Sequence, residues 1–574
     1  MSRLCLSASL LVLSLALAHA AGADTLKKPA LDALVSASKA KPSADFDAFL
    51  TDAARTNPQL ASAVAAYRAK TPLAGDDLVN IGRLLGIYNR IHNQAAAIDA
   101  IGRMVALRTV RDEKTPPHES APIIAFGQLV EAMAKDFGLQ YRNVDNRVFE
   151  VTLTGEGKET FGILTHADVV PVVADEWVLE DGTRLDPFRV TRVGDLLYGR
   201  GTIDDKGSIA AALFAMHSVR QSGVRLQRSI RLMIETTEET GGDGMKYYQE
   251  RTSLPEFNVV LDSKYPAVVA EKGSGALTVQ FPLQATEASA AAIVAMRGAA
   301  SANTIPQTAT ARIEGGDPGA VAAALEKARD AFIRQYEPQG GKFTIDIAAT
   351  TSGVDVKVNG TSAHGSRPEE GVNPVPRLAL FLQASGVAFA DNHHAKAVKY
   401  LNELYGTGYL GEKMGVGYGD DFMGPLTMSP TLLRERDGQL EVTANVRMPR
   451  GSTPQELTAK IAERVNAWAA ARGATLKIAY EQGNWMARDP QGRWLSTLLN
   501  IFGDTTGLDA RPVSTAGSTT AKLMPNAINF GPAMPGKKYT AHNAKEYKEV
   551  PDLDLDMQMF TEMLVRIGNL DKMQ

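Results

Sequence analysis

Histidines and acidic residues follow several short apolar runs of this 574-residue chain. His166-Ala167-Asp168 comes directly after the run Phe161 to Thr165, and Glu238-Glu239 closely follows the run Ser229 to Ile234. A third short run ends in Asp262. Short β-branched runs predict strands, and α/β sheets bind ligands at the carboxyl ends of their strands. These side chains are therefore expected at the edge of a sheet where such sites form.

A glycine-bracketed pair of aspartates and a late histidine extend this set. The segment Gly199 to Gly207 contains Asp204-Asp205 and leads into a helical segment, and His542 lies in Tyr539-Thr540-Ala541-His542-Asn543. A phosphate-binding loop is the competing interpretation, but such loops do not offer two adjacent carboxylates. Each motif alone is also consistent with a solvated acidic turn or a packed histidine. Together, in a chain with nine histidines, the motifs indicate a metal site.

This inventory suits a two-metal hydrolase. Two divalent ions about 3.5–4 Å apart need a carboxylate that bridges them, together with terminal histidine and carboxylate ligands. A free carboxylate beside the attacking water can take its proton and pass it to the leaving amine. Zinc is the expected metal, with manganese or cobalt as alternatives, because oxygen ligands relax the selectivity that thiolates impose.

The combined motifs resemble the co-catalytic metallopeptidase family of aminoacylase, carboxypeptidase G, succinyl-diaminopimelate desuccinylase and the peptidase V and carnosinase dipeptidases. The resemblance covers about residues 122–574. It implies that Asp204 bridges two ions, with one further pair of ligands on each. The metal ligands that it implies are His166, Asp204, Glu239, Asp262 and His542.

The resemblance also implies the residues that act beside the metals. Glu238 would be the general base and acid, and Asp168 would orient His166 through its far ring nitrogen. Asp205 would stand next to the ligands and is a candidate to receive the free ammonium group of a dipeptide. His364, in Ser362-Ala363-His364-Gly365-Ser366, resembles the lid histidine that donates a hydrogen bond to the tetrahedral oxyanion.

Four further residues resemble the substrate-binding positions of the family. Asn303 stands in Asn303-Thr304-Ile305-Pro306, and Gly517 and Ser518 stand in a small-residue loop. Arg447 resembles the arginine that binds the substrate carboxylate, although it could also pair with a surface acid. Peptidase V members have a doubly glycine-rich loop here and a different segment after the ligand corresponding to Asp262, so the substrate preference stays open.

The order of helical and strand patterns predicts an α/β protein with a catalytic domain in two segments, a mixed sheet flanked by helices, and an inserted α+β lid. We expect a signal peptide at 1–20, a helical N-terminal extension at 24–105, catalytic segments at 106–274 and 483–574, and the lid at 275–482. Within the lid, amphipathic helices are expected at about Glu287 to Arg297, Pro318 to Tyr336, Val375 to Ser385 and Thr453 to Arg472.

The N-terminus and the composition indicate where the protein acts. Met1-Ser2-Arg3, an apolar run and Ala18-His19-Ala20 form an export signal that contains the single cysteine, Cys5. We therefore expect an exported, periplasmic protein with no membrane anchor after cleavage. The net charge of −4 indicates no nucleic-acid partner.

Three functions are consistent with these motifs. A metallo-dipeptidase acting on small peptides is favoured because the long lid resembles that of peptidase V. The alternatives are an N-acyl-amino-acid deacylase and a non-catalytic binding protein, which would have no need of Glu238. The lid also has room for a second repeat, so we expect a monomer in which His364 acts within its own chain.

Overall fold

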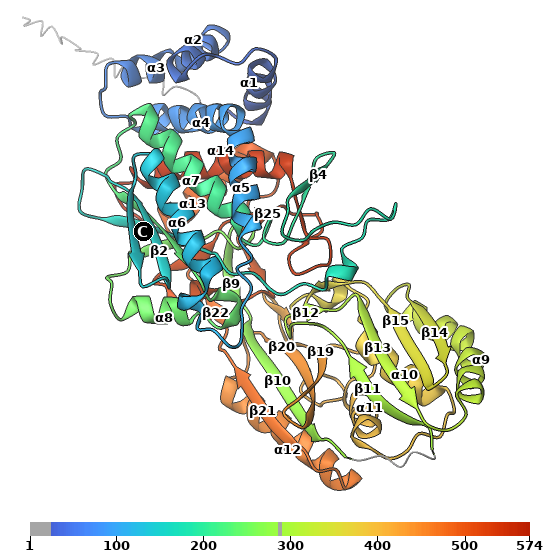
Figure 1. Ribbon diagram of the computed structural model, residues 1–574. Coiled ribbons are helices and arrows are strands. Elements are labelled where there is room, and N and C mark those ends of the chain that lie inside the picture. Colours follow the sequence, from blue (N-terminus) through green and yellow to red (C-terminus); the bar gives the residue numbers. More distant parts are fainter. Residues whose placement is uncertain (1–24, 285–289) are drawn as a thin grey trace, which may run out of the picture.

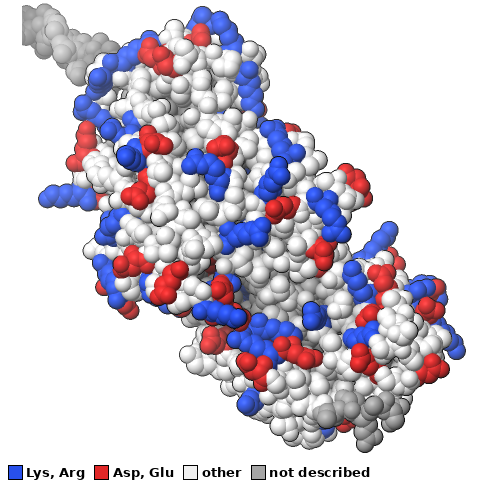
Figure 2. Space-filling view, viewed as in Figure 1, with Lys and Arg blue, Asp and Glu red and all other residues white. Residues whose placement is uncertain are grey.

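The computed structural model describes residues 25–284 and 290–574, so the predicted signal peptide lies outside the described residues. Figure 1 shows a helical N-terminal region, a central α/β domain and a lid at the opposite end. The predicted fold class is confirmed: one mixed sheet receives strands from both sides of the lid in the sequence. Among the described helices, none is long and apolar enough to cross a membrane. On the face seen in Figure 2, basic and acidic side chains are interspersed.

The central domain is built on a nine-stranded sheet in the order β1-β2-β6-β3-β7-β24-β9-β22, with β23 beside β9. β3 lies parallel to both β6 and β7, so the carboxyl ends of these strands meet at one edge. The strands are β1 (Gln140–Val144), β2 (Val148–Leu153), β3 (Thr160–His166), β6 (Ser229–Glu235), β7 (Phe257–Val260), β9 (Val268–Glu271), β22 (Met486–Ala487), β23 (Val513–Thr515) and β24 (Ala527–Asn529).

Helices cover this sheet and bury its apolar side chains. β7 is buried along its whole length, as expected for a strand inside a partly parallel sheet. α7 packs against α14 and β3, and it ends where Gly223 adopts a φ of 73°. The helices of this domain are α6 (Ala121–Asp136), α7 (Lys206–Ser222), α8 (Asp243–Gln249), α13 (Arg493–Thr506) and α14 (Val550–Ile567).

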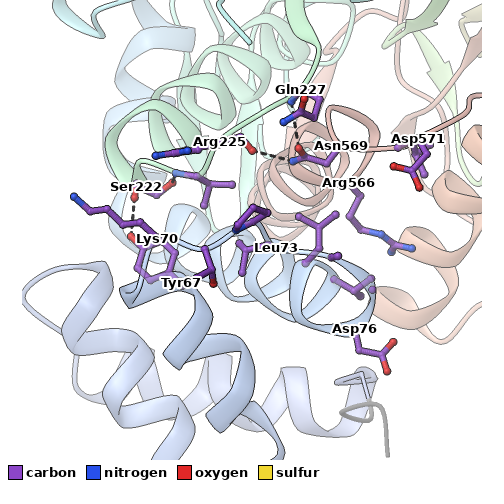
Figure 3. Close-up of a pocket in the computed structure, with 18 of the residues that line it drawn as sticks. Tyr67, Lys70, Leu73, Asp76, Ser222, Arg225, Gln227, Arg566, Asn569 and Asp571 are labelled. Carbon is purple, nitrogen blue, oxygen red and sulfur yellow. Dashed lines mark hydrogen bonds between the residues drawn. The ribbon is translucent and has the colours of Figure 1, made fainter. Parts of the chain in front are cut away.

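The N-terminal helices share their apolar core with the central domain. α4 packs along α14, and the fully buried Arg83 binds Glu562 at 3.1 Å and Asp504 at 2.6 Å. A cavity of about 1160 Å³ lies at this junction, where the Tyr67 hydroxyl donates to the Ser222 carbonyl (Figure 3). The helices are α1 (Lys28–Ala40), α2 (Phe46–Thr56), α3 (Ala61–Arg68), α4 (Gly75–His92) and α5 (Gln94–Ala106).

The lid consists of two four-stranded sheets that share a second apolar core. The first has the order β19-β20-β10-β21, and the turn between β19 and β20 places Asp437 and Gly438 at φ values of 50° and 72°, as a two-residue hairpin requires. Its strands and helices are β10 (Gly273–Pro282), α11 (His393–Leu404), β19 (Thr427–Arg436), β20 (Gln439–Met448), α12 (Pro454–Arg472) and β21 (Lys477–Gln482).

The second lid sheet has the order β11-β13-β15-β14 and is covered by α9 and α10. A short two-stranded sheet of β12 and β16 adjoins it and carries His364. These elements are β11 (Ala292–Arg297), β12 (Thr304–Ile305), β13 (Thr308–Glu314), α9 (Pro318–Tyr336), β14 (Thr344–Thr350), β15 (Gly353–Asn359), β16 (Ala363–His364) and α10 (Pro374–Ala384).

The helix expected at Glu287 to Arg297 is wrong over its described end, because residues 292–297 form β11. Alanine favours a helix, but this intrinsic preference is small, and the burial of Ile293 and Met296 in the lid core outweighs it. A bulge between Ile293 and Ala295 interrupts the two-residue alternation, so the strand pattern was hidden in the sequence.

Candidate active site

The ends of neighbouring strands bring the first predicted ligands together. His166 is the last residue of β3 and pairs in register with Glu235, the last residue of β6. Asp262 follows two residues after β7. Both His166 and Asp262 are buried, so the parallel arrangement of these strands places an imidazole and a carboxylate at one edge of the sheet.

Asp204 lies between the two predicted metal-binding histidines. Its Oδ1 is 2.8 Å from His166 Nε2, and its Oδ2 is 3.2 Å from His542 Nε2. His542 Nε2 also lies 2.7 Å from Glu239 Oε1, and His166 Nε2 lies 3.7 Å from Asp262 Oδ2. The structure thus brings all the predicted ligands together, with one histidine and one acid on each side of Asp204.

The charge at this site fits divalent cations. Burial and the negative charge of Asp262 raise the pKa of Glu238 well above its usual range, and burial and Asp204 raise the pKa of Asp262 to about 7. Burial alone would also raise the pKa of Asp204, but its hydrogen bonds with His166 and His542 outweigh burial and lower it. Buried carboxylates packed this closely repel each other unless cations lie between them.

Asp168 contacts the site in two ways. His166 Nδ1 lies 3.0 Å from the Asp168 carbonyl oxygen and 3.5 Å from its Oδ1. The two carboxylate oxygens of Asp168 accept the backbone N–H groups of Glu238 and Glu239, each at 3.1 Å. Asp168 therefore holds the two glutamates as well as the histidine, and His166 Nδ1 lies closer to the backbone oxygen of Asp168 than to its carboxylate.

Glu546 holds the loop that carries Asp204, and nothing in the sequence motifs had identified it. Its Oε1 accepts the backbone N–H groups of Gly201, Ile203 and Asp204 at 3.0, 3.1 and 3.3 Å. Its Oε2 lies 2.6 Å from Arg200 Nη1. Gly201 has a φ of 93°, a conformation that a side chain would strain. The position of Asp204 thus depends on a residue more than 300 positions away in sequence.

Asp205 cannot be the ammonium-binding residue suggested by the sequence. Its side chain is completely buried, and within the described chain neither carboxylate oxygen has a hydrogen-bond partner. Burial and the charge of Asp262 raise its pKa well above the usual range. Because Asp205 does not line the cleft, a substrate has no access to it.

The lid places His364 against the catalytic domain of the same chain. Its ring stacks on that of His542 with centroids 4.3 Å apart. Its Nδ1 accepts the backbone N–H of Ser366 at 3.1 Å, so the proton lies on Nε2. Burial and then the charges of His542 and Arg447 lower the pKa of His364 well below its usual range. His364 is therefore a neutral hydrogen-bond donor at the edge of the acidic cluster.

A cleft of about 640 Å³ between lid and catalytic domain joins these groups to the predicted substrate-binding residues. Arg447 lines it from β20 and forms no ion pair with any described residue. Asn303 donates from Nδ2 to Glu239 Oε2 at 3.1 Å, so this side chain orients a predicted metal ligand as well as lining the cleft. Gly517 and Ser518 line the opposite wall.

A separate cluster of His393, His394 and Glu435 lies in the lid and does not line this cleft. His394 Nε2 is 3.1 Å from Glu435 Oε1, and His393 Nδ1 accepts the backbone N–H of Gln284 at 3.0 Å. That bond leaves the proton of His393 on Nε2, so this nitrogen would have to lose it before binding a cation.

Comparison with known proteins identifies the family of this chain. The family model described as peptidase family M20/M25/M40 matches residues 162–566. A Beta-Ala-Xaa dipeptidase from Lactobacillus delbrueckii subsp. lactis is 27% identical over 482 residues, covering 82% of this chain and 96% of the relative. A putative dipeptidase of Bacillus subtilis (strain 168), YtjP, is 25% identical over 80% of this chain and 95% of its own.

Solved structures share the fold at lower identity. Human carnosine dipeptidase 1 has a TM-score of 0.54 at 13% identity, covering 87% of this chain and 100% of that chain. The dipeptidase Dug1p from Saccharomyces cerevisiae has a TM-score of 0.53 at 11% identity, covering 85% and 98%. The chain therefore belongs to peptidase family M20/M25/M40 and is a peptide hydrolase.

Proposed function

We propose that this protein is a metallo-dipeptidase that holds two divalent ions, zinc or alternatively manganese or cobalt, at one end of its cleft. The observation that carries this proposal is the position of Asp204, whose two oxygens face different histidines. His166 and Asp262 would hold one ion, and Glu239 and His542 the other. Bound there, the ions supply the Lewis acidity that activates a water molecule and polarises the scissile carbonyl.

Two residues of the chain would carry out the proton transfer and stabilise the oxyanion. Glu238 lines the cleft and would take a proton from the attacking water and return it to the leaving amine. His364 carries its proton on Nε2, so it can donate to the oxygen on which negative charge develops. A binding protein without catalysis would need neither of these groups.

A dipeptide fits the cleft better than an N-acyl amino acid. Arg447 forms no ion pair with a described residue and can bind a free terminal carboxylate with two hydrogen bonds. Both kinds of substrate carry that carboxylate, so the part of the cleft that receives the other end of the substrate discriminates between them. The large apolar side chains of the cleft lining are Leu523 and Tyr539, which form no extended slot for an acyl chain. Two of the similar proteins have names that describe them as a dipeptidase acting on Beta-Ala-Xaa and as a carnosine dipeptidase.

The decisive measurement compares kcat/KM for Ala-Leu, N-acetyl-leucine and Ala-Leu amide after the metal-depleted protein is reloaded with zinc, manganese or cobalt. We expect Ala-Leu to be preferred, because only it offers both a free ammonium group and a free carboxylate. A preference for N-acetyl-leucine would make the protein a deacylase. Equal cleavage of the amide would show that Arg447 does not bind the terminal carboxylate.

The same model of the site predicts that His364 acts within its own chain, since its ring already stacks on His542 of that chain. Mixtures of the inactive variants His364→Ala and Glu238→Gln should therefore recover no activity under conditions that allow subunits to exchange. Recovery would require a site shared between two chains. Size measurement by light scattering would show whether the protein is the expected monomer.

A further inference from the structure

Two cations of the cleft lack an acidic partner in the part of the chain that the structure describes. Of the lysines and arginines that line it, Lys246 pairs with Asp243 at 3.0 Å and Arg367 with Glu370 at 3.2 Å. Arg447 forms no ion pair, and neither does Lys522, when all described residues are considered.

Lys522 is held in place by neutral acceptors. Its Nζ donates to the Lys272 carbonyl at 2.6 Å and to Ser518 Oγ at 2.7 Å, which leaves one of its three N–H donors unused. The neighbouring carboxylate of Glu271 is already bound by Thr519 and by Asn529 Nδ2, the latter at 2.6 Å. The ammonium charge of Lys522 is therefore oriented but not neutralised.

The two free cations belong to different walls of the cleft. Arg447 stands on the lid strand β20, whereas Lys522 stands on η7 (Thr520–Leu523) of the catalytic domain. Burial and the positive charge of Arg447 lower the pKa of Lys522, to about 8, although nearby Glu271 acts in the opposite direction. Lys522 is thus mostly charged at pH 7. A half-buried charge without an acidic partner destabilises the folded protein until an anion binds beside it.

We propose that Lys522 binds a second substrate carboxylate, that of an acidic side chain, so that preferred substrates are dipeptides ending in aspartate or glutamate. This inference rests on the proposed function, in which Arg447 binds the terminal carboxylate. Ser518 Oγ, which touches Lys522 Nζ, lies on the same wall and can bind the same side chain.

The test compares kcat/KM for Ala-Glu and Ala-Gln, two substrates of the same shape that differ in charge. In the wild-type protein we expect Ala-Glu to be favoured about 10- to 100-fold, the usual effect of a hydrogen bond to a charged group. In Lys522→Met this ratio should fall to near one, and Lys522→Arg should restore part of it. Lys246→Met is the matched control, because it removes an exposed, already paired cation of the same cleft and should keep the ratio.

Each outcome decides a different point. If the wild-type protein cleaves Ala-Gln as well as Ala-Glu, the inference is wrong while the dipeptidase function stands. If Lys522→Met slows the cleavage of both substrates equally, Lys522 binds the terminal carboxylate together with Arg447. That result also makes the inference wrong. Calorimetric binding of glutamate against glutamine, in wild type and in Lys522→Met, tests the subsite even if neither dipeptide is cleaved, and lack of cleavage would instead contradict the proposed function.

Discussion

Replacing Glu238 by glutamine should lower kcat by about 10²- to 10⁴-fold, the usual loss when a general base is removed. The amide keeps the size of the side chain but cannot take a proton from the attacking water. The geometry also places Glu238 near His166 and Asp262, so metal content must be measured beside the rate. We expect the variant to retain its metal by elemental analysis while losing turnover.

Glu235→Gln is the matched control for this experiment. Glu235 ends β6, is completely buried and does not line the cleft. Burial raises its pKa to about 8, so its carboxyl group is mostly neutral at pH 7 and an amide replaces it closely. Its effect on kcat should be far smaller than that of Glu238→Gln. Near-normal turnover of Glu238→Gln with full metal content would refute the assignment of the base.

Asp204→Asn should weaken metal binding about 10²- to 10⁴-fold, since removal of one charged partner from a buried cluster costs about 3–5 kcal/mol. Asp204 faces His166 with one oxygen and His542 with the other, so a single substitution affects both halves of the site. Activity should fall in proportion to the metal that the variant loses. Titration with a chelating indicator would measure the affinity, and the number of ions bound per chain would test whether two are held.

The adjacent residue supplies the control here. Asp205→Asn makes the same change at a buried carboxyl group that has no hydrogen-bond partner in the described structure. Because Asp205 forms no ion pair with either histidine among the described residues, replacing its carboxylate by an amide should alter metal affinity far less than Asp204→Asn does. If both variants lose metal equally, the bridging role of Asp204 is wrong.

The sequence by itself determined which candidate ligand side chains meet at one edge of the sheet. Ligand-type side chains stand at or just after the carboxyl ends of β3, β6 and β7, and parallel strands bring these ends to one edge whatever the rest of the chain does. The fold class followed from the same alternation of strands and helices. These features are local, since each depends on a side chain and the strand or loop directly beside it.

The tertiary structure alone decided which distant residues complete the site. Glu546 supports the Asp204 loop and Asn303 orients Glu239. Lys522 forms no ion pair within the described residues because Glu271 is bound elsewhere. Tertiary packing also decided that residues 292–297 form a strand, because Ile293 and Met296 are buried in the lid core. Hydrogen bonding, burial and ion pairing depend on neighbours in space, and a single sequence records neighbours along the chain only.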